Sequence, residues 1–114
     1  MKKRADFLRV ASISKKDQTQ WVSQSMIIQL APSEELNIRY GVTVSKKVDK
    51  AAIRRNRIKR RLRAALDNVL LDYNHQAYDI VAIGRKLTLD CPFDKIENDL
   101  RWCLKRLNIR KNIS

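Results

Sequence analysis

The chain has 114 residues, and its 25 lysines and arginines outnumber 12 acidic residues to give a net charge of +13. It is 44% hydrophobic and contains only two glycines and two prolines, so it can bury one modest core and is not rich in linkers. A sequence pI near 10.3 predicts a nucleic acid or an anionic membrane as the partner. We therefore expect one domain over residues 1–114, with a frayed basic tail over 110–114.

Several classes of protein are excluded. No apolar run approaches the roughly 20 residues of a membrane-spanning helix. The basic N-terminus is interrupted by Asp6 and Arg9, which leaves no signal-peptide core. Two cysteines, Cys91 and Cys103, are too few for a disulfide framework and lack the spacing of metal ligands. We therefore expect a cytoplasmic protein with reduced thiols and no membrane association.

The N-terminal segment, residues 2–12, is predicted to form a short helix. Phe7, Val10 and Ala11 give it a small apolar face that basic side chains surround. Phe7 is either a core residue or an aromatic side chain on which a base of single-stranded nucleic acid stacks. Residues 13–20 are polar and are predicted to form a loop or a frayed edge strand.

Two strands are predicted next, over residues 21–30 and 38–45, with a turn at 31–35 between them. Alternation gives each strand one strongly apolar face. The opposite faces carry Ile27, Gln29, Arg39, Gly41, Thr43 and Ser45. Gly41 leaves room there for the close approach of a ligand or another backbone.

Residues 45–63 form the most strongly patterned stretch, with ten lysines and arginines and a single acid, Asp49. A helix from about Ala51 to Tyr73, ending near Asn74, would place an apolar stripe against a core and guanidinium groups on the opposite face. The stripe consists of Ile58, Leu62, Ala65, Leu66 and Val69. A solvated surface helix usually interleaves acids with its bases, but none occurs between Lys50 and Asp67. Because guanidinium binds phosphate oxygens in a fork, this face is predicted to bind a polyanion.

The remaining segments complete the predicted sheet and its cover. Residues 79–84 form a short apolar strand suited to the centre of a sheet, and Arg85 and Lys86 follow it. A last helix opens at residues 91–93, and Trp102 lies off its core stripe. That stripe consists of Phe93, Ile96, Leu100, Cys103, Leu104 and Leu107.

No active site is evident in the protein itself. A protein nuclease needs a carboxylate metal cluster or a paired general acid and base. His75 is the only histidine, beside a predicted helix end. Residues 64–100 carry seven acids against three bases, and these acids, Asp79 among them, are predicted to lie mostly on an acidic side away from the arginine array. We therefore expect no catalytic residue and no metal ligand.

These motifs resemble those of the bacterial ribonuclease P protein family. The signature is Ser45-Lys46-Lys47, followed after seven residues by Arg55-Asn56-Arg57-Ile58-Lys59-Arg60 and Arg63. Similar segments are Lys3-Arg4-x-x-Phe7-x-x-Val10, Arg39–Val44 and Asp79–Val81, and the resemblance covers residues 2–108. It implies an α/β (α+β) two-layer sandwich of about four strands and three helices in the order αβββαβα. It also implies a left-handed β-α-β crossover through the basic helix, where the general rule predicts a right-handed one.

The resemblance further implies that the chain is the non-catalytic protein subunit of the endoribonuclease ribonuclease P. In that family the RNA subunit is the catalyst and uses Mg²⁺. The protein binds this RNA and the 5′ leader of precursor tRNA to promote 5′-end maturation, and no other protein partner is required. The implied RNA-binding residues are Arg55, Asn56, Arg57, Lys59, Arg60, Arg63, Ser45, Lys46 and Lys47. The implied leader-binding cleft comprises Phe7, Arg9, Gln29, Gly41 and Thr43.

Two residues depart from the aromatic pattern of that cleft. Gln29 stands where some family members have Tyr, and Ala11 stands where some have a second Phe. Stacking on the leader should therefore be weaker here, and contacts that do not depend on the base should matter more.

Three other functions fit part of the pattern. A structural RNA-binding protein such as a small ribosomal protein has the same size and charge, but it does not account for the Phe7 helix or the Ser-Lys-Lys spacing. A protein-only nuclease would cleave without an RNA subunit. A membrane-surface module would need bulky apolar residues for the bilayer, whereas Ile58, Leu62 and Leu66 are required here for the core.

Overall fold

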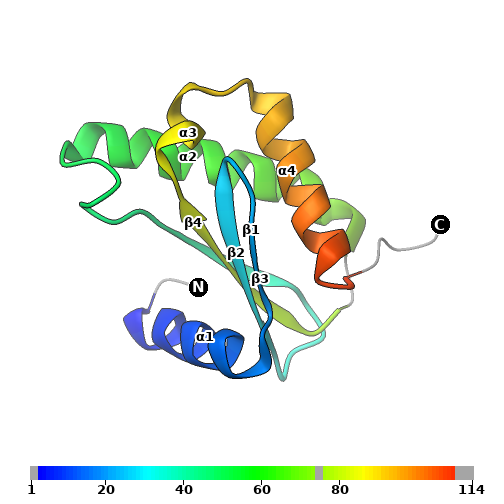
Figure 1. Ribbon diagram of the computed structural model, residues 1–114. Coiled ribbons are helices and arrows are strands. Elements are labelled where there is room, and N and C mark those ends of the chain that lie inside the picture. The colour runs from blue at the N-terminus through cyan, green and yellow to red at the C-terminus, as the bar shows by residue number, and fades with distance from the viewer. Residues whose placement is uncertain (1–2, 74–75, 110–114) are drawn as a thin grey trace.

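The computed structural model describes residues 3–73 and 76–109, which form one four-stranded sheet with helices on both faces (Figure 1). The α/β class and the four-stranded sheet are confirmed, whereas η1 and α3 were not predicted. Residues 74–75, which include His75, and the predicted tail over 110–114 lie outside the described residues. In chain order the elements are α1 (Arg4–Asp17), β1 (Gln20–Val22), β2 (Met26–Pro32), β3 (Arg39–Thr43), α2 (Ala52–Val69), the 3₁₀ helix η1 (Leu70–Tyr73), β4 (Tyr78–Gly84), α3 (Lys86–Asp90) and α4 (Phe93–Arg106).

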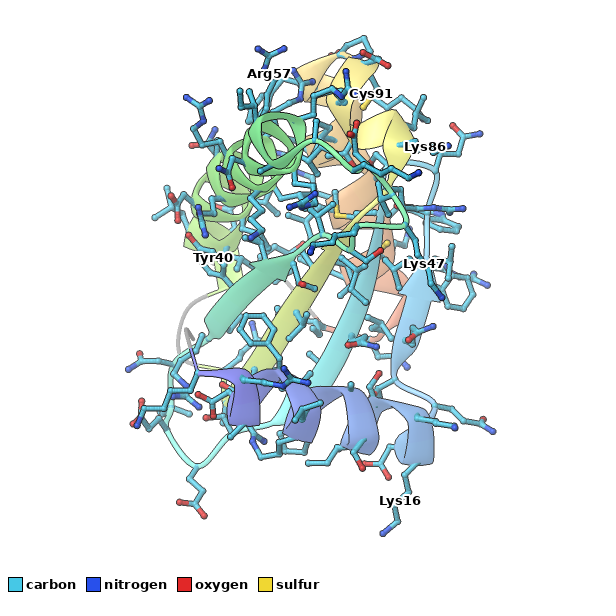
Figure 2. The ribbon with its side chains drawn as sticks, turned by 90° about the vertical axis from the view of Figure 1, so that its left-hand side faces the viewer. Lys16, Tyr40, Lys47, Arg57, Lys86 and Cys91 are labelled. Atoms are coloured by element: carbon cyan, nitrogen blue, oxygen red, sulfur yellow. The ribbon has the colours of Figure 1, made fainter. Side chains whose placement is uncertain are left out.

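The sheet has the strand order β1-β2-β4-β3. β2 pairs antiparallel with both β1 and β4, and β3 pairs parallel with β4. A parallel neighbour needs a crossover connection, and α2 supplies it. Figure 2 views the sheet with α1 in front and with β4 to the right of β3, while α2 packs on the opposite face from α1. The crossover is therefore left-handed, as the resemblance implies and against the general rule.

Three predicted boundaries were wrong. Residues 21–30 form two strands rather than one, because Ser23 closes a turn: its amide and its hydroxyl donate to the Met26 carbonyl at 2.8 and 2.7 Å. α1 continues to Asp17 through the predicted loop, because Ile13 packs against the core beneath it. α2 ends at Val69, after which the chain tightens into η1.

Apolar cores lie on both faces of the sheet. The larger core is shared by the sheet, α2 and α4, and it contains the whole predicted stripe of α2. The smaller core lies under α1, where Val10 packs with Ala31 and Val81, and Phe7 and Ile13 lie against them. α1 is thus held by a small contact area, and it leaves part of its sheet face uncovered.

Gly84, at the end of β4, sets the distance between α2 and the sheet. A Cβ atom at this position would lie 2.5 Å from Cγ2 of Ile58 and 2.7 Å from Cγ2 of Val44. These distances are shorter than van der Waals contact, so only glycine lets α2 approach β4 this closely. The basic helix is therefore fixed against the sheet at the end where the Ser45–Lys47 segment leaves β3.

Candidate nucleic-acid interface

Two arginines in the first turns of α2 bind the loop that precedes the helix. Arg54 Nε donates to the Asp49 carboxylate at 2.7 Å, and Arg55 Nη1 donates to the carbonyl oxygens of Asp49 and Lys50 at 2.9 and 2.8 Å. Asp49 also accepts a hydrogen bond from the Ala51 amide at 2.9 Å. The hydrogen bond from Arg54, followed by that from Ala51, lowers the pKa of Asp49. The only acid of the basic stretch thus shapes its loop, and Arg55 holds that loop in place.

A third arginine of α2 also has a partner inside the protein. Arg61 donates to the backbone carbonyl of Cys91, which links α2 to the start of α4. Cys91 is buried, and this burial raises the pKa of its thiol. Arg61 was not among the predicted RNA-binding residues, and its contact identifies it as a structural residue.

The other basic residues of α2 point outward. Arg57, Arg60 and Arg63 are exposed, and Lys59 is half-buried. Within residues 3–73 and 76–109, none of these four residues donates a hydrogen bond or forms an ion pair. Figure 2 shows Arg57 projecting from α2 on the side away from the sheet. These side chains, with exposed Asn56 beside them, form a row of cations whose charge the described part of the protein does not neutralise.

The segment between β3 and α2 continues this row of cations. Ser45, Lys46 and Lys47 are exposed, and the Ser45 carbonyl accepts hydrogen bonds from the amides of Val48 and Asp49 at 3.1 and 3.5 Å. We call the following set the basic face: Ser45, Lys46, Lys47, Arg55, Asn56, Arg57, Lys59, Arg60 and Arg63. These nine predicted RNA-binding residues lie on α2 or on the segment that leads into it, and Arg55 is half-buried and mainly holds the loop.

The predicted leader-binding cleft corresponds to the sheet face beside α1. Gln29, Val81 and Gly41 are aligned across β2, β4 and β3. Thr43 lies one row further toward the Ser45–Lys47 segment, and Phe7 packs against the α1 side of the same face. Gln29 and Thr43 are half-buried, Gly41 is buried, and Gln29 Nε2 donates to Gln20 Oε1 at 3.0 Å. We call Phe7, Arg9, Gln29, Gly41 and Thr43 the leader cleft.

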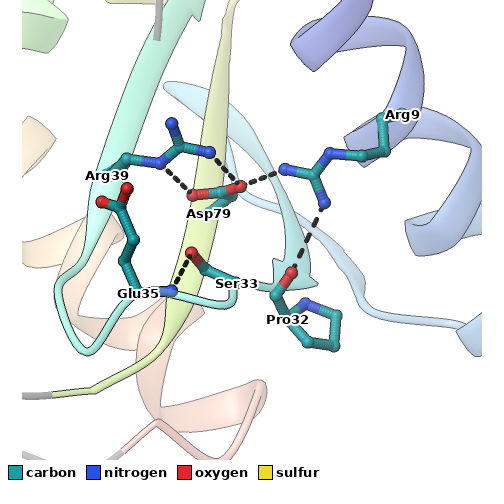
Figure 3. Close-up of polar contacts among 6 residues, drawn as sticks. All are labelled: Arg9, Pro32, Ser33, Glu35, Arg39 and Asp79. Atoms are coloured by element: carbon teal, nitrogen blue, oxygen red, sulfur yellow. Dashed lines mark hydrogen bonds and ion pairs between the residues drawn. The ribbon is translucent and has the colours of Figure 1, made fainter.

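Arg9 of this cleft is bound to a buried carboxylate. Arg39 donates from Nε and Nη2 to the two oxygens of Asp79, each at 2.9 Å, and Arg9 donates to Asp79 from the other side (Figure 3). Asp79 is 0% exposed, while the two arginine side chains are 37% and 38% exposed. Burial acts to raise the pKa of Asp79, but the hydrogen bonds and charges of Arg39 and Arg9 outweigh it and hold that pKa below its usual value.

Asp79 therefore lies buried beside Arg9 and Arg39 and does not form part of an exposed acidic side. Asp79 lies under α1, where it neutralises two cations of the sheet face. Arg9 fastens α1 to the sheet through this contact and through the Pro32 carbonyl at 3.4 Å. Just over a third of its side chain remains exposed.

A groove lies beside the Thr43 end of the leader cleft, where Ile83 is the register partner of Thr43, and it includes Ser45 and Lys47 of the basic face. It has a volume of about 770 Å³ and lies between the Ser45–Lys47 segment and α3. Its apolar floor contains Ile27 and Ile83, and Lys47 and Lys86 stand on its walls, on the same side of the molecule (Figure 2). We call it the Lys47 groove.

Lys86 is a candidate functional residue that the sequence prediction missed. It opens α3, whose start is fixed when the Arg85 amide donates to Thr88 Oγ1 at 3.0 Å and the Thr88 hydroxyl donates to the Ser25 carbonyl. The sequence feature that could have identified Lys86 is the Arg85-Lys86 pair directly after the central strand. Its position beside Lys47 depends on α3, which was not predicted.

Within residues 3–73 and 76–109, no three His, Cys, Asp or Glu residues come close enough together to hold a metal ion. No helix in these ranges is long and apolar enough to cross a membrane.

Comparison with known proteins gives one consistent result. The family model described as Ribonuclease P matches residues 1–108. The ribonuclease P protein component of Paramagnetospirillum magneticum is 42% identical over 112 residues, covering 94% of this chain and 80% of the relative. That of Ruegeria pomeroyi is 40% identical over 115 residues, covering 97% and 87%.

Solved structures agree with the sequence relatives. The RNase P protein of Staphylococcus aureus superposes with a TM-score of 0.73 at 29% identity, covering 96% of this chain and 94% of the other. The RNase P protein of Thermotoga maritima has a TM-score of 0.76 at 24% identity and covers 93% and 94%, which shows a shared fold.

Proposed function

This chain belongs to the ribonuclease P protein family, and we propose that its basic face binds the catalytic RNA while its leader cleft binds the 5′ leader of precursor tRNA. As a member of this family, it is the protein subunit of an endoribonuclease whose catalysis in bacteria is by RNA, and ribonuclease P RNA is its partner. The relatives favour this function over a structural ribosomal protein.

The observation that carries the assignment of the basic face is that Arg57, Arg60 and Arg63 have no hydrogen-bond or ion-pair partner among residues 3–73 and 76–109. These residues recur every three positions on a rigid helix, so their Cα atoms are about 4.5 Å apart along its axis. Exposed like charges at this spacing repel one another, and a phosphate backbone that lies along the helix relieves that repulsion. Guanidinium groups also donate paired hydrogen bonds to phosphate oxygens.

The leader cleft suits a single strand rather than a duplex. Its surface is a half-covered sheet face with the small side chain of Thr43, the amide of Gln29 and the half-buried ring of Phe7. Single-stranded RNA presents bases that can lie on such a surface, while its phosphates reach flanking cations. Lys47 and Lys86 supply these cations at the end nearest the basic face. We propose that both bind leader phosphates as the leader approaches the catalytic RNA.

Three further assignments belong to this proposal. Mg²⁺ used in cleavage is held by the RNA rather than by the protein. The chain acts as one RNA-binding domain and needs no second protein partner. The site of action is the cytoplasm, where precursor tRNA is processed.

Reconstitution tests the proposal. The protein is mixed with precursor tRNA, with and without a bacterial ribonuclease P RNA, at near-physiological Mg²⁺, and release of the 5′ leader is measured. We expect efficient cleavage only with both components. The double variant Arg57→Ala/Arg60→Ala should lower cleavage at limiting protein by about tenfold or more, because each lost charge-assisted hydrogen bond weakens binding by about that factor.

A matched control removes two exposed cations elsewhere. Lys15 and Lys16 lie in the last turn of α1, and Lys16 projects away from the basic face in Figure 2. Lys15→Ala/Lys16→Ala changes the net charge equally and should leave cleavage within about twofold of the original. Full activity of Arg57→Ala/Arg60→Ala, with a circular dichroism spectrum that shows it is folded, would contradict the assigned role of the basic face. Cleavage by the protein alone would contradict catalysis by the RNA.

A further inference from the structure

An exposed tryptophan lies outside both the basic face and the leader cleft. Trp102 is on α4 and is 47% exposed. Its ring meets the ring of Trp21 edge-on, with centroids 5.4 Å apart and planes at 68°. The Arg106 guanidinium lies over the Trp21 ring at 4.8 Å from its centroid. Trp21 therefore supports the indole of Trp102 from one side, and nearly half of Trp102 is left open to solvent.

The helical period places cations on the same side of α4 as Trp102. Lys105 and Arg106 follow it by three and four residues, and both are exposed. In the other direction, Asn98 precedes it by four residues and Lys95 by seven, about two turns of helix. An aromatic ring with cations before and after it suits single-stranded nucleic acid, because a base stacks on the ring while the neighbouring phosphates reach the cations.

A groove of about 670 Å³ runs beside Trp102, between α4 and the turn that joins β1 to β2, and we call it the Trp102 groove. Its lining includes Gln24, Arg85, Lys95 and Asn98, all of which carry N–H donors. Arg85 is exposed and donates from Nη1 to the Ser23 carbonyl at 2.7 Å. A guanidinium has five N–H donors, so Arg85 keeps others for a ligand.

One carboxylate in this groove is already bound within the protein. Asp99 accepts hydrogen bonds from the amide and the hydroxyl of Ser25 at 3.2 and 2.7 Å, and Lys95 Nζ lies 3.6 Å from its other oxygen. Because Lys95 balances Asp99, the charge of Arg85 makes the groove positive overall. A polyanion therefore complements it.

RNA fits this surface better than a protein does. In a symmetric dimer the same patch would meet itself, so Arg101, Lys105 and Arg106 of two copies would face one another and repel. The large apolar residues exposed at the groove are Val22 and Trp102, and two side chains provide much less apolar area than the core of a stable protein interface.

The position of the groove favours the catalytic RNA over the leader. The leader cleft ends beside Lys47 and Lys86, and the catalytic RNA lies at this end in the proposed function. Arg85 directly precedes Lys86 and lines both the Lys47 groove and the Trp102 groove. The Trp102 groove thus begins close to the catalytic RNA, whereas the distal nucleotides of the leader leave the cleft at its other end.

We propose that an unpaired base of the catalytic RNA stacks on Trp102, with its flanking phosphates bound by Arg85 in the groove and by Lys105 further along α4. The inference rests on the proposed function, because it takes the catalytic RNA to lie at the Lys47 end of the leader cleft. This contact is a second anchor, separate from the basic face, and two anchors on different helices fix the orientation of the protein on the RNA. Every base has a stacking face, so the contact does not depend on which base is presented.

Fluorescence tests the contact directly. The chain has two tryptophans, so Trp21→Phe leaves Trp102 as the sole emitter. Catalytic RNA alone, without precursor tRNA, should quench this emission as it binds. Normal binding of the RNA with no change in Trp102 emission would overturn the inference. A signal that requires precursor tRNA would overturn the assignment of the catalytic RNA as the ligand.

Affinity for the catalytic RNA separates stacking from charge. Trp102→Ala should weaken binding by about tenfold and leave the slope of log affinity against log salt unchanged, because it removes a stacking surface and no charge. Trp102→Phe should keep most of the affinity, and Lys105→Ala should reduce the slope by about one unit. Unchanged affinity in Trp102→Ala would overturn the inference.

Leu36→Ala is the matched control for loss of an exposed apolar side chain. Leu36 is 64% exposed in the turn between β2 and β3, and it lines neither the Trp102 groove nor the Lys47 groove. This variant should bind the catalytic RNA as tightly as the original protein does. A tenfold loss in Leu36→Ala as well would show that the effect is not specific to Trp102, and would count against the inference.

Chemical footprinting of the catalytic RNA distinguishes a direct contact from an altered fold. Trp102→Ala should expose a base that the original protein protects, while the protections that depend on Arg57 and Arg60 remain. Loss of all protections together would show that Trp102 acts only through the fold, and would overturn the inference. If Arg57→Ala/Arg60→Ala left both the affinity and the footprint unchanged, the proposed function itself would be wrong.

Discussion

Arginines serve opposite purposes in two regions of this protein. Under α1, Arg9 and Arg39 converge on the buried carboxylate of Asp79 and fasten the helix to the sheet. On α2, Arg57 and Arg60 stand in solvent with no acceptor among the described residues. The side chains are the same, and the difference is whether the fold supplies a counter-charge. Arginines with a partner stabilise the fold, whereas those without one leave a charge for RNA to neutralise.

The same distinction exists within α2 itself. Arg55 and Arg61 donate to backbone carbonyl groups, while Arg57 and Arg60 donate to none in the part of the chain that the structure describes. A count of arginines on a helix therefore overstates the number available to a ligand. The contrast can be tested by removing members of each group and measuring stability and RNA binding separately.

The largest expected effect is on RNA binding. Arg57→Ala/Arg60→Ala should weaken binding to ribonuclease P RNA by about a hundredfold and should reduce the slope of log affinity against log salt by about two units. Its free energy of unfolding should stay within about 0.5 kcal/mol of the original, because no internal contact is lost. Filter binding at several salt concentrations and urea denaturation measure the two quantities. If Arg57→Ala/Arg60→Ala were destabilised and the salt dependence of its RNA binding were unchanged, these arginines would act like Arg9 and Arg39, and the distinction between the two regions would be wrong.

The opposite result is expected at the buried carboxylate. Asp79→Asn leaves Arg9 and Arg39 without their counter-charge, and loss of one partner from a buried pair typically costs about 3–5 kcal/mol. Because both arginines are more than a third exposed and can turn to solvent, we expect a decrease of about 2 kcal/mol in the free energy of unfolding. Urea denaturation measures it. Asp90→Asn, at an exposed acid in α3, is the control and should change stability by less than about 0.5 kcal/mol.

Stability should also depend on pH through Asp79. Its pKa is lower in the folded protein than its ordinary value of 3.8, so the unfolded chain binds a proton first as the solution is acidified. The contribution of Asp79 is complete above that ordinary value and is lost as the pH falls through the lower pKa of the folded state. The original protein should therefore lose stability more steeply below pH 3.8 than Asp79→Asn does. Parallel acid titrations of the two proteins would contradict this assignment.

The smallest effect is expected at Tyr40, which binds an acid of α2. The Tyr40 hydroxyl donates to Asp67 on α2, and Tyr40→Phe should lower the free energy of unfolding by about 1 kcal/mol. Burial, together with the neighbouring Asp67, raises the pKa of Tyr40 to about 12. Ultraviolet titration of tyrosinate should show a component near this pH in the original protein that is lost in Tyr40→Phe, while burial also raises the pKa of Tyr73 in both proteins. A component that persists in the variant would assign it to another tyrosine.

Local pattern was sufficient for much of the fold and for part of the interface. The stripe Ile58, Leu62 and Leu66 determined which side of α2 is buried, and therefore that Arg57 and Arg60 face outward. Alternation along β2 and β3 placed Gln29 and Thr43 on one sheet face. These features were predictable because the period of a helix or strand fixes side-chain direction without knowledge of distant residues. The hand of the crossover came from the resemblance alone.

Only the tertiary structure decided which cations are free. Asp79 follows Arg9 by 70 residues and Arg39 by 40, and no local period relates the three. The strand order β1-β2-β4-β3 brings them together by placing β4 between β2 and β3, with α1 above. The same packing carries Lys86 to Lys47, and both residues line the Lys47 groove. Sequence determined where the charge is, because composition and period are local, and tertiary structure decided where it is neutralised, because ion pairing depends on distance in space.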